Sequence, residues 1–459
     1  MNRKMRLVNA FLIILSMFLV IPTNTGVYME SRTTLDYQGF PVNFQDFPDA
    51  FTSDNSIVAW DDDMIDVEKV SFTGDSVYVA VLDTGLKRNW RDYFPEENIV
   101  TEWGRSFIDE GIMKGVKTGN FVSHVVESRD FTGEHPHGTF VISNIIGFSM
   151  NGTYIAGIAP NAKIIPVKVL EVYNGLHDVY ATDEAIAAGI YYVADLAKSH
   201  PDSRFVISMS IGDPVPISEV QKNAIDYAIS QNVIVVAAAG NEGVNGMLSP
   251  ASYAPVISVG LSGWASYTEK YGWTGEWVQE IDGDIYFDSS FWVRDVPEDN
   301  AYLTYISDFS SRERSDLWPQ ELDIIAPGSF VLGPFPFAPG QSHLPWWSNG
   351  KGNGVAEQYW FLSGTSLACP HVSAVAALML QANPSLTQAE VESLLRSSAD
   401  PLPFSGSQKV LQIDPNTGSI DPNTGSINYV TWGFDGYNAV GYGLLQADSA
   451  VEAALTYKK

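Results

Sequence analysis

Five short apolar runs, separated by helical or turn-forming stretches, constrain the fold of this chain more than any other feature. Each run is rich in β-branched residues and stays apolar at successive positions, which is typical of a strand buried on both faces. The runs cover residues 77–82, 162–170, 204–211, 232–239 and 254–261. We therefore expect these segments to form neighbouring strands inside one sheet.

Helical patterns connect the later runs. Residues 182–200 begin with Thr182, a residue type suited to a helix N-cap, and carry acids first and bases last. Residues 216–231 have apolar positions at spacings of three and four. Strand–helix–strand repetition with buried strands predicts an α/β fold, a doubly wound, mostly parallel central sheet with helices on both faces. In such sheets, sites form at the carboxyl ends of the strands.

Four polar residues lie at the ends of these predicted elements. Asp83 ends the first run, and Asn241 follows the fourth. His137 opens an apolar, helical stretch, and Ser366 directly precedes an alanine-rich helical stretch. Each residue taken alone carries little information, since a lone aspartate after a strand is usually a turn residue. Together they place Asp, His, Asn and Ser at element ends of one sheet.

The segments around these four residues resemble those of subtilisin-type serine proteases, the subtilase family. VAVLDTG contains Asp83, HGT begins at His137, AAAGNEG contains Asn241 and SGTSLACPHV contains Ser366. The blocks GIAPNAKIIPVKVL, SPASYAPVISVG and GYGLLQADSAV resemble the family too. All of them run in family order from about residue 55 to the C-terminus, and the chain order Asp, His, Ser is that of subtilisin.

The resemblance implies a secreted serine endopeptidase that hydrolyses peptide bonds through an acyl-enzyme. A serine hydroxyl is a poor nucleophile until a base removes its proton. His137 would be that base, Asp83 would orient it, and Ser366 would attack the scissile carbonyl. The side-chain amide of Asn241 and the backbone N–H of Ser366 would form the oxyanion hole.

Three other residues could compete for these roles. Cys369 lies one turn deeper in the same helical stretch than Ser366, among apolar neighbours, and we expect it to be a buried small hydrophobe. His371 follows a proline in the same block, and we interpret it as structural. His135 lies two residues before His137. The Gly-Thr pair that follows His137 selects the latter as the base, because the family motif places its histidine there.

The resemblance also assigns the substrate-binding residues. An extended peptide can add as a strand to an exposed backbone edge. The predicted pocket for the side chain before the scissile bond (P1) has one wall from Ser210, Ile211 and Gly212, the opposite wall from Ala238, Ala239 and Gly240, and Leu248 at its floor. We expect this pocket to prefer uncharged P1 side chains of modest size.

A structural calcium ion is the one metal that the resemblance suggests. Asp92 sits where the family's strong site has a carboxylate, and Asn151 could supply a further oxygen ligand. The family's matching glutamine near the domain start is not evident in this sequence, so calcium binding stays open at this point. We expect no cofactor to be required for the chemistry.

The N-terminus has the layout of a signal peptide in residues 1–26. Three basic residues precede an apolar stretch over residues 7–21. An uncleaved membrane anchor is the alternative, although the stretch is short for a full span. We expect a secreted, extracellular protein with no stable membrane span after cleavage, or a membrane-tethered one without cleavage.

Two further segments complete the predicted organisation. Residues 27–54 are a short pro-segment or N-terminal extension, and residues 55–459 are the catalytic domain. Relative to the family, this domain carries insertions, which we expect to be β-rich loops, near residues 111–130, 262–306, 329–360 and 405–435.

The acidic composition of the chain limits the classes of molecule that it can bind. The chain has 54 acidic against 26 basic side chains, a formal net charge of -28, so its surface repels nucleic acid and anionic membranes. Its single cysteine excludes an intrachain disulfide. We expect a monomer that binds protein or peptide substrates in extended form and binds no nucleic acid.

Two other functional classes remain open from the sequence. The same machinery could ligate or cyclise peptides, or the scaffold could be a non-catalytic binding protein. The intact Asp83, His137, Asn241 and Ser366 set argues against the latter. A sedolisin-type acid peptidase shares the SGTS block but uses a glutamate base, and the HGT block disfavours it.

Overall fold

The computed structural model describes most of the segment predicted as the catalytic domain. The described residues are 56–110, 124–150, 153–173, 178–264, 278–281, 284–287, 296, 304–307, 309–314, 316–329, 331–336, 359–402, 405–411, 429–435 and 438–458. The predicted signal peptide and the predicted 27–54 segment lie outside them.

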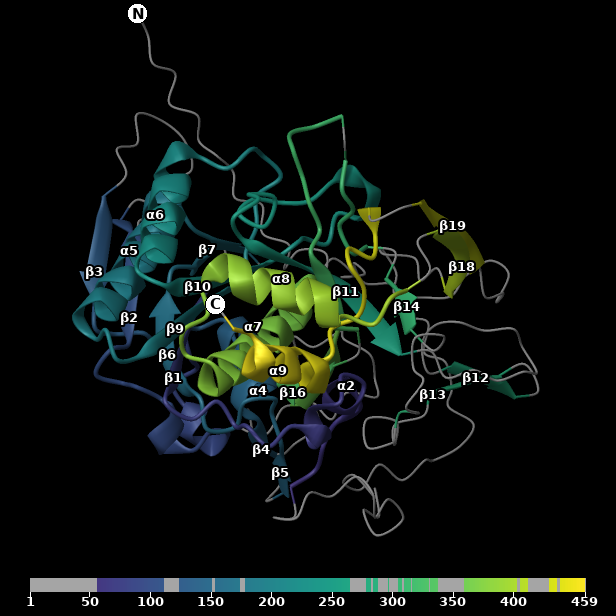
Figure 1. Cartoon of the computed structure of the whole chain (residues 1–459), viewed down its shortest axis with the longest axis horizontal. Helices are drawn as coiled ribbons and strands as arrows, with labels where there is room; N and C mark the ends of the chain where they lie inside the picture. Colours follow the sequence, from purple (N-terminus) through teal and green to yellow (C-terminus); the bar gives the residue numbers. More distant parts are fainter. Residues whose placement is uncertain are drawn as a thin grey trace, which may run out of the picture.

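One large, mostly parallel sheet forms the centre of the molecule (Figure 1). Its strand order is β14-β11-β10-β9-β1-β6-β2-β3, and β15 also pairs with β11. The strands are β1 (Val77–Asp83), β2 (Arg105–Asp109), β3 (Val125–Ser128), β6 (Lys163–Lys168), β9 (Arg204–Met209), β10 (Val233–Ala238), β11 (Ile257–Trp264), β14 (Thr304–Ile306) and β15 (Ile324–Pro327). All five predicted strands are present. Only β3 and β14 pair antiparallel with their neighbours.

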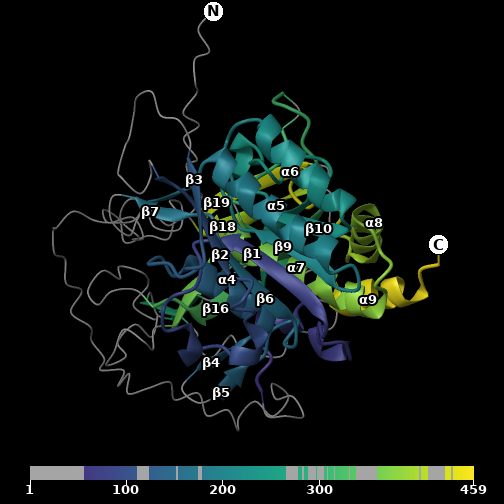
Figure 2. The same ribbon diagram turned by 90° about the vertical axis from the view of Figure 1, so that its left-hand side faces the viewer.

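Helices cover both faces of this sheet, as the continuous apolar strands require (Figure 2). In β1, Val79 and Val81 pack into the core on the face of α4 (His137–Ile146) and α7 (Thr365–Ala382). Ala80 and Leu82 pack into the core on the opposite face, with α5 (Asp183–Ser199) and α6 (Glu219–Ser230). The doubly wound α/β fold is therefore confirmed.

Local sequence explains where the α5 and α6 helices begin. The Thr182 side chain accepts a hydrogen bond from the N–H of Ala185 at the start of α5, as the N-cap prediction requires. The Ser218 side chain accepts from the N–H of Gln221 at the start of α6 in the same way.

The remaining described elements are short or lie outside the central sheet. They are α2 (Trp60–Asp63), η3 (Val67–Lys69), η4 (Trp90–Asp92), η5 (Glu96–Asn98), β4 (Phe148–Met150), β5 (Thr153–Ile155), β7 (Glu171–Tyr173), β8 (Asp178–Tyr180), η6 (Gly243–Asn245), α8 (Gln388–Ser398) and α9 (Ala447–Thr456).

Each predicted insertion contributes at least one strand within the described residues. The strand β3 ends the first insertion at the sheet edge. The others carry the antiparallel pairs β12 (Val278–Ile281) with β13 (Asp284–Phe287), β16 (Val331–Pro334) with β17 (Tyr359–Leu362), and β18 (Ser405–Leu411) with β19 (Tyr429–Asp435). The described residues of these segments thus lie largely in strands, as expected.

Among the described residues, α7 is the one helix long and apolar enough to cross a membrane, by length and composition alone. Of this helix, 89% is buried inside the protein. It is the central core helix that begins next to Ser366.

Candidate active site

The site is built at the carboxyl ends of three neighbouring strands. Leu82 in β1 lies opposite Met209 in β9, which lies opposite Ala237 in β10. The residues that follow these positions are brought to one edge of the sheet because the strands are parallel. Asp83 ends β1 there, and the chain after β10 carries Asn241 to the same edge.

Asp83 and His137 form a buried pair. Both carboxylate oxygens of Asp83 lie 2.9 Å from Nδ1 of His137, and Asp83 Oδ1 also accepts the N–H of Thr84 at 2.6 Å. A carboxylate only accepts hydrogen bonds, so Nδ1 carries the proton and Nε2 presents its lone pair. Nε2 is buried and has no hydrogen-bond partner among the described residues. This imidazole is held in the tautomer that a general base needs.

The glycine after His137 lets the helix α4 approach β1 closely. A Cβ at Gly138 would lie 2.5 Å from the carbonyl oxygen of Gly85 and 3.1 Å from Oδ1 of Asp83. The N–H of Gly138 donates to Oγ1 of Thr84, which itself donates to the carbonyl of His135. Thr84 therefore locks the start of α4 against the end of β1.

Ser366 is the second residue of α7, the helix whose first turn leaves N–H groups without intrahelical partners. Pro370, four residues later, has no N–H to donate to the carbonyl of Ser366. Ser210 Oγ donates to that carbonyl instead, at 2.7 Å. Ser210 was predicted as a pocket wall, and here its hydroxyl fixes the backbone of Ser366.

Asn241 is oriented by Thr365. The N–H and the hydroxyl of Thr365 both donate to Oδ1 of Asn241, each at 2.9 Å. Because a backbone N–H can only donate, the atom facing it must be Oδ1, and the amide nitrogen points elsewhere. Nδ2 of Asn241 is buried and unpartnered among the described residues. It is an available donor on a side chain that is held by Thr365, the residue before Ser366.

Two supporting residues were missed by the sequence reasoning. Thr84 and Thr365 both lie inside the motifs DTG and GTS that identified Asp83 and Ser366. Their hydroxyls join elements that are distant in sequence. The sequence shows a threonine next to Asp83 and another next to Ser366. It does not show which distant group each threonine hydroxyl bonds.

The predicted pocket residues lie together next to this site. Ile211, Gly212, Ala238 and Ala239 are buried. Leu248 N–H donates to the carbonyl of Ala239.

Gly240 has a φ of +116°, a conformation that favours glycine. A Cβ at Gly240 would lie 2.6 Å from Cγ of Leu248 and 2.7 Å from Oγ of Ser311. The wall that ends at Gly240 is therefore packed against Leu248.

Cys369 and His371 are both buried deeper in α7. Burial raises the pKa of the Cys369 thiol to about 11, so it carries no thiolate near neutral pH. His371 is hydrogen-bonded to the carbonyl of Leu367 and to Asp61. Neither side chain is exposed to a substrate.

The predicted calcium ligands are only partly described. Asp92 ends η4, is exposed, and accepts a hydrogen bond from Nδ2 of Asn89 at 3.0 Å. Asn151 lies outside the described residues.

The chain is similar to known proteins of one family. The subtilase family model matches residues 74–424. Subtilisin E of Bacillus subtilis (strain 168) is 28% identical over 332 residues, covering 72% of this chain and 61% of its own. An alkaline protease of Alkalihalobacillus alcalophilus is 27% identical over 330 residues, covering 72% and 60%. The chain thus spans about three fifths of the length of these relatives.

The solved structure of the S41 psychrophilic protease is 22% identical, with a TM-score of 0.49, and covers 74% of this chain and 89% of its own. The family model spans most of the chain and includes all four residues of the site. The chain belongs to the subtilase family.

Proposed function

We propose that the protein is a secreted serine endopeptidase. The observation that carries this proposal is the buried Asp83–His137 pair, which leaves Nε2 of His137 unpartnered at the sheet edge shared with Asn241 and Ser366. Family membership and the similarity to subtilisins support the same reaction class.

In the proposed reaction, Oγ of Ser366 attacks the scissile carbonyl while its proton moves to Nε2 of His137. The oxygen that becomes negative accepts hydrogen bonds from Nδ2 of Asn241 and the N–H of Ser366. His137 then gives its proton to the leaving amine, and an ester of Ser366 remains. Water, deprotonated by the same imidazole, hydrolyses that ester and restores the hydroxyl. The Ser366–His137 hydrogen bond forms on substrate binding, since such contacts often tighten only in the complex.

The proposed substrates are proteins or peptides bound in extended form beside the segments that follow β9 and β10. The small, uncharged side chains of Ala238 and Ala239 support the expected preference for uncharged P1 residues of modest size. Initial rates on peptides with small aliphatic, aromatic or basic P1 residues measure this preference. Dominant cleavage after Arg or Lys contradicts it.

Secretion, a monomeric state and a chemistry without cofactor belong to the same proposal. A structural calcium ion at Asp92 remains part of it, tested by a fall in melting temperature on chelation. N-terminal sequencing of the exported protein locates the cleavage sites.

Labelling by a fluorophosphonate probe combined with peptide hydrolysis tests the function. Ser366→Ala should abolish labelling and lower kcat by about 10⁴-fold or more, since the nucleophile is lost. Asn241→Ala should retain labelling and lower kcat by about 10²–10³-fold. Cys369→Ala is the matched control and should keep both, because the buried thiol takes no part.

Two outcomes overturn the proposal. Absence of labelling in the folded wild-type protein means a non-catalytic scaffold. Labelling at Ser366 with joined or cyclised peptides as the main products, identified by mass spectrometry, means a ligase.

A further inference from the structure

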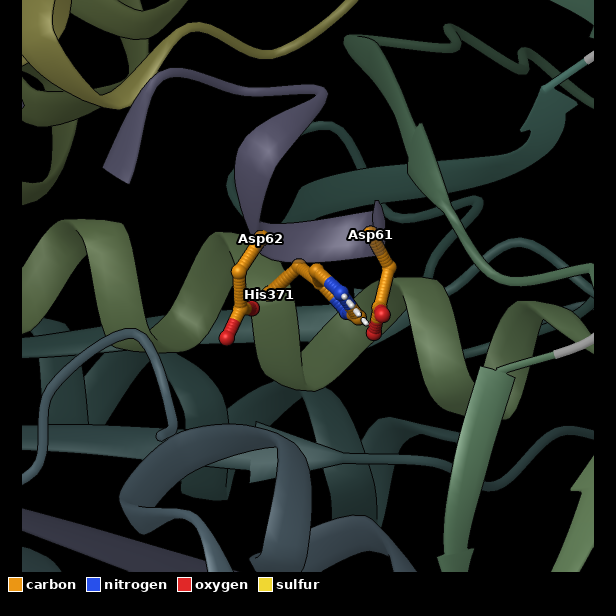
Figure 3. A group of neighbouring side chains, drawn as sticks. All are labelled: Asp61, Asp62 and His371. Carbon is orange, nitrogen blue, oxygen red and sulfur yellow. Dashed lines mark hydrogen bonds and ion pairs between the residues drawn. The ribbon is translucent and has the colours of Figure 1, made fainter. Parts of the chain in front are cut away.

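A second group of chemically reactive side chains lies apart from the Asp83–His137 pair, between α2 and α7. Asp61 and Asp62 of α2 lie on either side of His371 of α7, and the Asp61 carboxylate contacts the imidazole (Figure 3). All three are buried, with exposed fractions of 5%, 3% and 0%. The proposed reaction uses none of them.

The imidazole of His371 is oriented like that of a metal ligand. Its Nδ1 lies 2.7 Å from the carbonyl oxygen of Leu367, which can only accept, so Nδ1 carries a hydrogen. Its Nε2 lies 3.2 Å from Oδ2 of Asp61. Metal-binding histidines commonly donate their other ring N–H to a backbone carbonyl in this way. The Nε2 lone pair faces a carboxylate oxygen. Two lone pairs repel each other, so this contact is favourable only when a proton or a metal ion lies between the two atoms.

When both are ionised, the carboxylates of Asp61 and Asp62 carry more negative charge than one proton on His371 can balance. Oδ1 of Asp61 is buried and has no hydrogen-bond partner in the described part of the chain. Within the described residues, no lysine or arginine pairs with Asp61 or Asp62. Burying unpaired carboxylates is costly, and coordination to a metal is one of the two usual ways of compensating them.

We propose that Asp61, Asp62 and His371 bind a divalent transition-metal ion of the Zn²⁺ class. One donor atom from each residue lies within 4.8 Å of the others. The 3.2 Å between Nε2 and Oδ2 is close to the roughly 3.3 Å edge of a tetrahedron with metal bonds of about 2.0–2.1 Å. Imidazole with carboxylates suits zinc or a similar ion, whereas calcium takes oxygen ligands. A fourth position is left for water.

This site would join the first described helix to the helix that carries the nucleophile. His371 lies five residues after Ser366 in α7, and the two aspartates lie on a segment distant in sequence. Metal binding would therefore stabilise the contact between α2 and α7. The site is separate from the proposed reaction, so its test does not depend on activity.

The test uses full-length Ser366→Ala protein, in which self-digestion is removed, after chelation and buffer exchange. Titration with Zn²⁺ alone, followed by calorimetry and metal analysis, should show one tight site per chain and a higher melting temperature. Bound Co²⁺ should give the visible absorption of a site with nitrogen and oxygen ligands. Asp62→Asn and Asp61→Asn should each weaken Zn²⁺ binding by about tenfold or more. Asp202→Asn, which removes an exposed charge elsewhere on the chain, should keep wild-type affinity.

Failure of Zn²⁺, Mn²⁺ and Co²⁺ all to bind overturns the site and leaves the His371–Asp61 hydrogen bond as a purely structural contact. Tight Zn²⁺ binding that both Asp61→Asn and Asp62→Asn leave unchanged also overturns it, since the ion then binds elsewhere on this acidic chain. Asp61→Asn and Asp62→Asn are first checked for wild-type melting behaviour without metal. If only one of them folds normally, its Zn²⁺ affinity alone decides the test.

Discussion

At the residue scale, the N–H that Pro370 lacks determines how the backbone of Ser366, the proposed nucleophile, is held. Pro370 cannot donate to the carbonyl of Ser366, and Ser210 Oγ takes its place. Ser210→Ala would leave that buried carbonyl unsatisfied, at a cost of about 1–3 kcal/mol in the free energy of unfolding. We expect that loss in urea denaturation, together with a lower kcat and a smaller change in KM, because the position of Ser366 is relaxed. Ser373→Ala is the matched control, since its hydroxyl donates to the carbonyl of Cys369, which the helix already satisfies. Equal losses in both variants would contradict this role of Ser210.

At the element scale, the connection from β9 to α6 makes stability depend on pH. Asp213 exchanges two main-chain hydrogen bonds with Ser249, and both of its carboxylate oxygens are buried without partners among the described residues. Burial, aided by the charge of Asp183, raises the pKa of Asp213 from 3.8 to about 7. The folded state therefore holds this proton more tightly than the unfolded chain, so the stabilisation is complete below about pH 4 and is lost as pH rises through about 7. Asp213→Asn should flatten part of that slope in urea denaturation of the Ser366→Ala protein. The exposed Asp202→Asn should keep the wild-type slope, and an unchanged slope in Asp213→Asn would refute the prediction.

At the scale of the whole molecule, the central sheet separates two hydrophobic cores, and the chain around them carries a net charge of -28. Repulsion among the surface carboxylates opposes folding and is screened by salt, because the Debye length shortens from about 30 Å at 0.01 M to about 3 Å at 1 M. Melting temperature should therefore rise with NaCl and equally with KCl, in the presence of a chelator. A flat or falling curve would show that the surface ion pairs, such as Arg91 with Glu96, outweigh the repulsion. The same field should speed the binding of cationic peptides at low salt.

The sequence alone determined five central strands, the helices α5 and α6, and the identities of the polar residues at the element ends. A strand buried on both faces requires a continuous apolar run such as 77–82. An N-cap such as Thr182 makes a local hydrogen bond. Both features can therefore be predicted from neighbouring residues in the sequence. The family motifs added Asp83, His137, Asn241 and Ser366 as candidates.

Only the tertiary structure decided which side chains meet. His371 and Asp61 are 310 residues apart, and Ser210 and Ser366 are 156 apart. Such contacts depend on how strands pair and on which face each helix covers, and no local pattern records that. The tautomer of His137, the orientation of the Asn241 amide and the carboxylates facing His371 follow from those contacts. The sequence supplied the functional groups, and the packing of α2, α4 and α7 against the sheet determined their partners.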